Sequence, residues 1–348
     1  MKKKCIFCGE PPQQKNKEHI LPKWLLKLTG FDQKEASIGS DFVTGKEFIF
    51  NILNFTMPAC TKCNTNFAKT EAVVKPAMEK LLIDDFIDLA ELTLLLDWFD
   101  KIRLGLQIAV LYLNNKNFEL EPRHYINRRV GLKDRSLSIT NTYDGSTTLA
   151  WTGVNTHAFL RSPNCFAIKI NHLIFVNCSL DFLLSEKLGY PYPKWQVDNP
   201  FTGKTDMLLV SGTRKLAKTI YQTPLYPPNV LVCQAIFKEA LAINNGLYDD
   251  PYVRLNSLDF VRGLGKVAVY QGDQRYWMGS DEEISFEGPN RQMKQYRWNR
   301  PVLTLQLEIM KSVRYNFDGL PDKYRKANEM VIRYVENSIK DQLKLFDY

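Results

Sequence analysis

The residues with the clearest capacity for chemistry are four cysteines in two pairs near the start of the chain. Cys5 and Cys8 form one C-x-x-C pair, Cys60 and Cys63 form a second, and 51 residues lie between the pairs. A C-x-x-C turn points two thiolates at one place, so two such turns supply the four sulfur ligands of a tetrahedral zinc site. Four unligated core cysteines are the alternative, and the paired spacing favours zinc. Because a site of four thiolates has no open position, this zinc would be structural.

An acid–histidine dipeptide lies between the two cysteine pairs. Glu18-His19 is followed by Ile-Leu-Pro, and Asn64 comes directly after the last cysteine. A single histidine is more often a surface or core residue, but a neutral imidazole near pH 7 is also the usual general base. The carboxylate of Glu18 and the amide oxygen of Asn64 are hard ligands of the kind that magnesium or manganese prefers. These three residues are therefore the candidates for catalysis.

These motifs together resemble a known enzyme family. The order C-x-x-C, E-H-I-x-P, C-x-x-C-N and then Glu71 is similar to the HNH (ββα-metal) endonucleases, most of all to a bacterial subgroup in which zinc knuckles frame the nuclease motif. The resemblance covers about the first eighty residues. It implies that His19 is the general base that activates water and that Glu18 binds a catalytic divalent metal, with Asn64 completing the metal site.

Two positions depart from the family pattern, and a third position of the pattern has two candidate matches. Asn64 stands where the family usually has histidine, and Glu18 stands where aspartate or histidine is commoner. The family's middle asparagine, which orients the base, is matched by Asn54, with Asn51 as the second choice. Glu71 lies two helical turns after Asn64, so it is either an outer partner of the metal or a salt-bridged surface residue, and we expect the second.

The charge of the chain is compatible with a nucleic-acid partner. The formal net charge is +8, and residues 1–80 hold 13 basic against 8 acidic side chains. A polyanionic partner would require such an excess at the nuclease motif, although plain solubility explains it equally. Residues 291–300 interleave basic residues with Tyr296 and Trp298, a pattern found both in single-strand binding and in amphipathic strands. We expect nucleic acid as the partner, DNA rather than RNA.

The remaining cysteines and the apolar segments indicate a cytoplasmic protein. Cys165, Cys178 and Cys233 are an odd remainder after the zinc ligands, and no apolar signal segment follows the first residues. Both features favour a reducing compartment. The most apolar stretch, residues 92–113, carries four charged residues in its middle, which predicts a buried helix and not a membrane span.

The first 82 residues are predicted to form the nuclease module. We expect a short strand at 17–20, a helix from Pro22 to Gly30, a β-hairpin over 41–50 and a helix over 64–82. Strand, hairpin and helix in this order are what the HNH resemblance implies. Residues 83–130 are predicted to be a helical connector, with one or two helices over 84–115.

The remainder, residues 131–348, is predicted to be an α+β recognition or regulatory domain. Strands are expected at 137–142, 147–152, 157–161, 165–170, 173–178 and 266–270. A final amphipathic helix is expected over 321–346, with its apolar side formed by Met330, Val331, Tyr334, Val335 and Ile339. Such a domain could respond to a regulatory protein or a small-molecule activator.

Two hypotheses for function come out of the sequence. The first is a zinc-stabilised, magnesium- or manganese-dependent endonuclease that hydrolyses phosphodiester bonds, in the setting of bacterial restriction or phage defence that the resemblance implies. The second is a catalytically inactive zinc-containing protein that binds nucleic acid or acts as a scaffold. Both predict an α+β chain with an N-terminal ββα-metal module.

Overall fold

The computed structural model describes residues 4–114, 121–142, 147–199, 201, 204–218, 220, 229–243, 245–286, 299–315 and 322–344. Helices and strands are mixed along this part of the chain, as the α+β prediction requires. No helix among the described residues is long and apolar enough to span a membrane. All seven cysteines lie in described segments and are free thiols.

The N-terminal part is built on two strands that lead into a long helix. Strand β1 (Lys15–Glu18) pairs antiparallel with β4 (Met57–Cys60), so that Glu18 lies opposite Met57. Helix α2 (Thr61–Leu82) follows β4 without a break. Helix α1 (Lys23–Leu28) and the hairpin of β2 (Glu35–Ser40) and β3 (Glu47–Asn51) are inserted between the two strands.

The hairpin was predicted with the wrong boundaries. Residues 41–46, expected to include its first strand, form the connecting turn instead. Oδ1 of Asp41 accepts hydrogen bonds from the backbone N–H groups of Val43 and Thr44, at 2.9 and 2.8 Å. Asp side chains favour such turns over extended backbone, and Gly45 adopts the positive φ of 70° that closes the turn.

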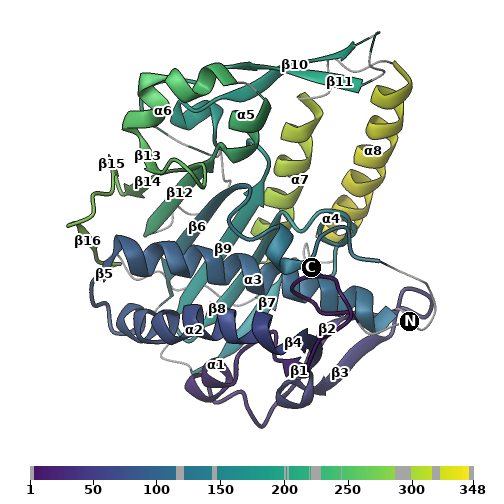
Figure 1. The fold of residues 1–348 in the computed structure, drawn as a ribbon. Coiled ribbons are helices and arrows are strands. Elements are labelled where there is room, and N and C mark those ends of the chain that lie inside the picture. Colours follow the sequence, from purple (N-terminus) through teal and green to yellow (C-terminus); the bar gives the residue numbers. More distant parts are fainter. Residues whose placement is uncertain are drawn as a thin grey trace.

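Helix α3 (Leu89–Asn114) runs through the centre of the molecule (Figure 1). The short strand β5 (Ile87–Asp88) precedes it and pairs with β16 (Glu283–Ile284). The predicted connector is thus a buried helix, and it shares one apolar core with residues of the N-terminal part and of the large sheet, including Leu25 and Leu137. The boundaries at residues 82 and 130 stay a prediction.

An antiparallel sheet forms the middle layer. Within the described residues it has eight strands, in the order β13-β14-β12-β6-β9-β8-β7, with β15 paired to β14. The bounds are β6 Asp134–Asn141, β7 Leu149–Thr152, β8 Cys165–Ile170, β9 Leu173–Leu180, β12 Val230–Ile236, β13 Ser257–Asp259, β14 Leu264–Gln271 and β15 Gln274–Trp277. A separate hairpin, β10 (Tyr192–Asn199) and β11 (Lys204–Val210), and helices α5 (Lys238–Ile243) and α6 (Pro251–Leu255) complete this part.

The two faces of the sheet pack against different helices. In β8, Phe166 and Ile168 contribute to the core that contains α3, whereas Cys165 and Ala167 pack with residues of α7 (Asn299–Tyr315). This alternation follows from the two-residue period of a strand. Helix α8 (Asp322–Lys344) packs against α7 on the side of the sheet away from α3 (Figure 1). The sheet is therefore covered by helices on both faces.

Residues 157–161 were predicted to be a strand, and this prediction is wrong. They form the short helix α4 (His157–Arg161). Oγ1 of Thr156 accepts a hydrogen bond of 3.0 Å from the backbone N–H of Phe159. This N-cap satisfies one of the free N–H groups at the start of a helix. It therefore favours the helix for an apolar five-residue run that could otherwise form a helix or a strand.

The buried side of α8 was also predicted incorrectly in part. Ile332, Val335 and Ile339 are buried, at intervals of three and four residues. Met330 and Tyr334, which were expected on the apolar side, are 74% and 59% exposed. The helix is rotated from the predicted orientation, and two large apolar side chains face outward.

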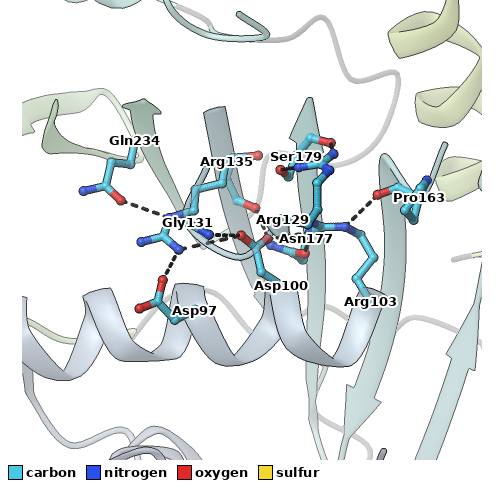
Figure 2. Close-up of polar contacts among 11 residues, drawn as sticks. Asp97, Asp100, Arg103, Arg129, Gly131, Arg135, Pro163, Asn177, Ser179 and Gln234 are labelled. Carbon is cyan, nitrogen blue, oxygen red and sulfur yellow. Dashed lines mark hydrogen bonds and ion pairs between the residues drawn. The ribbon is translucent and has the colours of Figure 1, made fainter. Parts of the chain in front are cut away.

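A network of buried charges joins α3 to the sheet (Figure 2). Asp100 accepts from Nη1 of Arg103 at 2.7 Å, and its other oxygen lies 3.7 Å from Nη1 of Arg135. All three side chains are fully buried. Asp97 also pairs with Arg135, and Oδ1 of Asn177 accepts from Arg103.

A third arginine adds positive charge to the network. Arg129 donates to Oγ and to the carbonyl oxygen of Ser179, at 3.0 and 3.2 Å. Burial, together with the neighbouring charge of Arg103, lowers the pKa of Arg129 to about 10. Within the network of Figure 2, three guanidinium groups face two carboxylates, so each carboxylate matters for the charge balance.

We expect Asp100→Asn to destabilise the protein by about 3–5 kcal/mol, because it leaves buried guanidinium charge without its partner. Urea unfolding of the variant and the wild type would measure the difference. Asp341→Asn is the matched control, since Asp341 forms an exposed i,i+3 pair with Lys344 and its replacement should leave the unfolding midpoint close to that of the wild type. Equal unfolding midpoints for Asp100→Asn and wild type would contradict a structural role for the network.

Candidate zinc centre and acid–histidine site

The two cysteine pairs meet in one place. The four Sγ atoms of Cys5, Cys8, Cys60 and Cys63 all lie within 4.8 Å of one another. The Sγ atoms of Cys8 and Cys60 are 3.8 Å apart, and two thiolates on a tetrahedral zinc at 2.3 Å would be about 3.8 Å apart. The cluster therefore fits a metal ion such as zinc, and among the described residues it is the only such group of three or more histidine, cysteine or acidic side chains.

Hydrogen bonds to sulfur support this cluster. The backbone N–H of Cys60 donates to Sγ of Cys5 at 3.2 Å, and Nδ2 of Asn127 donates to Sγ of Cys63 at 3.7 Å. Such donors orient thiolate ligands and stabilise their charge. Asn127 was not singled out from the sequence, because no local pattern places residue 127 beside residue 63.

The segment around Asn127 also fixes the first cysteine turn. The N–H groups of Ile126 and Asn127 donate to the carbonyl oxygens of Ile6 and Phe7, at 3.1 and 2.9 Å. Gly9 closes the turn with a φ of 81°, and a Cβ at this position would lie 2.5 Å from the ring of Tyr125. The cysteine cluster is thus held by hydrogen bonds to residues 125–127 as well as to β4.

Glu18, at the end of β1, is buried and already has a cationic partner. Nζ of Lys101, on α3, lies 2.5 Å from Oε1 of Glu18 and 2.9 Å from Oε1 of Glu71, on α2. The Lys101 side chain is 1% exposed. Glu71 forms a salt bridge as predicted, but its side chain is only 19% exposed and its partner is a buried lysine, so it is not the surface residue that was expected.

The charges in this group hold one another in place. Burial acts to lower the pKa of Lys101, but the two carboxylates outweigh it and raise that pKa above its ordinary value. Burial raises the pKa of Glu18, and the charge and hydrogen bond of Lys101 oppose that rise. Lys101 therefore stays protonated, and its ammonium group lies between two acidic side chains.

His19 has the protonation state that a base requires. Burial lowers its pKa, and the positive charges of Lys23 and Lys101 lower it further. The imidazole is therefore neutral at pH 7. Its Nδ1 atom is buried and has no hydrogen-bond partner among the described residues. The carbonyl oxygen of His19 lies 3.5 Å from Nζ of Lys101, which ties the backbone here to the same lysine.

Asn64 lies in the first turn of α2, beside β1. Its Nδ2 donates to the carbonyl oxygen of Lys17 at 3.3 Å, one residue before Glu18. Because this bond uses the amino end of the amide, the Oδ1 end remains for a cation or a substrate. The structure brings Asn64 to the strand that carries Glu18 and His19, as the sequence order suggested.

The two asparagines proposed to orient the base are placed differently. Asn51 accepts at Oδ1 from the N–H of Leu53 at 3.0 Å, a local cap of the short turn that follows β3. Asn54 is exposed at the end of that turn. Within the described part of the chain no hydrogen bond joins either side chain to His19, so the role of Asn54 stays a prediction. Of the aromatic–basic segment, residues 291–298 lie outside the described residues.

Lys101 is the site residue that sequence reasoning missed. It is separated from Glu18 by 83 positions and lies in the middle of an apolar helix. The available signal was a charged residue inside a segment predicted to be buried, because a buried lysine requires an acidic partner. Nothing in the sequence says which acidic residue that is.

Comparisons with protein-family models, with curated proteins and with solved structures found no match to this chain.

We expect the purified protein to contain about one zinc per chain, and Cys60→Ser to lose both the metal and most of the stability. A structural thiolate site contributes on the order of 10 kcal/mol to folding. Elemental analysis and thermal unfolding would measure the two effects.

Cys233→Ala is the control for this experiment. Cys233 is buried in a separate apolar cluster on the sheet, so its replacement should leave the zinc content unchanged. A well-folded wild-type protein without zinc would overturn the assignment of the cluster.

Proposed function

We propose that the protein is a metal-dependent endonuclease of the HNH type that hydrolyses phosphodiester bonds, with DNA as the more favoured substrate. The observation that carries the proposal is the convergence of three elements. Glu18 is the last residue of β1 and His19 follows it, β1 pairs with β4, and β4 leads through the last cysteine pair into α2, which carries Asn64 in its first turn beside β1. Along the chain, strand β1, the β2–β3 hairpin and helix α2 follow the order of strand, hairpin and helix that the HNH resemblance implies, which supports the proposal.

His19 takes the role of general base in this proposal. A neutral imidazole can accept a proton from an attacking water molecule, and the lowered pKa of His19 keeps it in that form at pH 7. The backbone of residues 17–19 is held by the β1–β4 pairing, by Asn64 and by Lys101. A base held in this way remains oriented without a large entropic cost.

In this proposal Glu18 and Asn64 are the protein ligands of a weakly held divalent cation. Glu18 and Asn64 offer a carboxylate and an amide oxygen, which suit magnesium or manganese. Bound there, the ion would stabilise charge on the phosphate and the leaving oxygen. Since Lys101 already neutralises Glu18, we propose that these residues bind the ion mainly together with the substrate phosphate, as magnesium sites commonly do.

Lys101 has the role of a positioning residue. It holds the carboxylates of Glu18 and Glu71 at 2.5 and 2.9 Å and thereby fixes β1, α2 and α3 around the candidate site.

The ion pair between Glu18 and Lys101 also favours a second function. Because Glu18 is buried and paired, it can serve as a structural residue without binding any metal. The protein would then be a zinc-containing nucleic-acid-binding or scaffold protein in which His19 has no catalytic role. The following experiments separate the two.

We expect His19→Ala to lower the rate of manganese-dependent plasmid nicking by about 10²–10⁴-fold, the usual effect of losing a general base. Zinc content and nucleic-acid affinity should stay close to those of the wild type, because affinity rests mainly on lysine and arginine contacts to phosphate. His172→Ala, on the loop between β8 and β9, is the control and should nick at the wild-type rate.

The scaffold function is supported if the wild type and His19→Ala are equally inactive with magnesium and manganese and bind nucleic acid equally well.

We expect Lys101→Met to be destabilised in the presence of a chelator of divalent cations that leaves the zinc bound, and to be restabilised by millimolar manganese. The substitution leaves two carboxylates close together without a counter-charge, and a divalent cation can supply it. Thermal unfolding with and without manganese would show the rescue. The double variant Lys101→Met/Glu18→Gln should lose most of it, and equal rescue in both variants would exclude Glu18 as a metal ligand.

A further inference from the structure

An open groove is formed where the end of α3, helix α4 and helix α8 meet the turn of the β2–β3 hairpin. None of its lining residues has a role in the proposed catalysis. Its volume is about 690 Å³, within the range of cavities that hold small organic ligands. Its lining includes Phe42, Leu111, His157 and Tyr334 together with the two arginines Arg123 and Arg161. It thus combines apolar walls with concentrated positive charge.

The two arginines have no acidic partner in this groove. Among the described residues, neither guanidinium forms an ion pair or a hydrogen bond with a side chain. Burial lowers the pKa of Arg161, and the charge of Arg123 lowers it further, so the two cations are close enough to repel each other. The acidic residue in the lining, Glu121, is already paired with Lys4 at 2.9 Å and accepts from Tyr125 at 3.1 Å. An anion that bound both arginines would relieve their repulsion.

The groove also offers aromatic surface. Tyr334 is 59% exposed. The ring of His157 contacts that of Tyr334 edge to face, with centroids 5.3 Å apart. Large exposed aromatic side chains beside guanidinium groups are suited to a flat ring that carries an anionic group.

A smaller cavity of about 280 Å³ adjoins this groove and shares Phe42, His157 and Leu160 with it. Gln342 lines the smaller cavity, and its Nε2 donates to the carbonyl oxygen of Asn155 at 3.4 Å. Its Oε1 is buried and has no hydrogen-bond partner among the described residues. A ligand with an N–H donor would satisfy this acceptor, since a buried polar atom normally has a partner.

We propose that the groove and the adjoining cavity bind a nucleotide whose base carries an exocyclic amino group. Its phosphate lies on Arg123 and Arg161, its base packs on Tyr334, and its amino group donates to Oε1 of Gln342. The binding site does not depend on whether the protein is a nuclease.

The groove is connected to the zinc centre through short contacts. Glu121, at its edge, is paired with Lys4, which directly precedes the ligand Cys5. On the other side, the N–H of Phe42 donates to Oδ1 of Asn114, the last residue of α3, at 2.8 Å. A nucleotide bound here therefore lies beside groups that are linked to the cysteine cluster and to α3.

Isothermal titration of the full-length, zinc-containing protein with adenosine monophosphate tests the proposal. We expect saturable binding of one nucleotide per chain. The variant Arg123→Gln/Arg161→Gln should bind at least about tenfold more weakly, because two charge-assisted contacts are lost. Tyr334→Ala should weaken binding about fivefold to a hundredfold through loss of stacking. These residues are exposed, so the variants should fold.

Matched controls make each part of the site falsifiable. Arg275→Gln, an exposed arginine on β15, should bind like the wild type. Inosine monophosphate, which has a carbonyl in place of the amino group, and inorganic phosphate should bind more weakly than adenosine monophosphate. The proposal is overturned if millimolar adenosine monophosphate does not bind, if the arginine and tyrosine variants bind it unchanged, or if only single-stranded oligonucleotides bind.

Discussion

The buried ammonium of Lys101 is the contact on which the candidate site depends. It lies between Glu18 and Glu71, and these three charged groups come from β1, α2 and α3. A carboxylate as deeply buried as Glu18 is stable only with a partner, and that partner is on a helix outside the first 82 residues. The sequence motif is therefore local, but the site it forms is completed by the middle of the chain. A fragment that ends at residue 82 would leave Glu18 without its counter-charge.

The same helix carries the charges that fix it to the sheet. Asp100 and Lys101 are adjacent in sequence and lie about 100° apart around the helix axis, so they face different neighbours. Asp100 contacts the arginines of the sheet side, and Lys101 contacts the acidic residues of the N-terminal side. Helix α3 thus joins two polar groups that are each buried in apolar surroundings. A shift of α3 along its axis would break both at once, which makes its position a shared requirement of the N-terminal part and of the sheet.

How far the sequence predicted this structure depends on the range of the interactions. The cysteine cluster and the β8–β9 hairpin were predicted because a C-x-x-C spacing and two neighbouring runs of strand-favouring residues are local patterns. Residues 157–161 were misassigned because a five-residue apolar run fits either structure, and one side-chain cap at Thr156 decides between them. Lys101 and Asn127 could not be predicted, since their partners are 83 and 64 positions away and no periodicity links them.

The position of Lys101 also bears on when a metal could bind. An ammonium and a divalent cation on the same carboxylate repel each other, by about 8 kcal/mol at 4 Å with an effective dielectric constant near 20. A phosphodiester brings a negative charge to the same place and offsets part of this repulsion. The ion and the substrate then bind more strongly together than either does alone. In such a site the metal is absent until nucleic acid arrives, and a nuclease with this arrangement would carry its structural zinc permanently and its catalytic ion only in the complex with substrate.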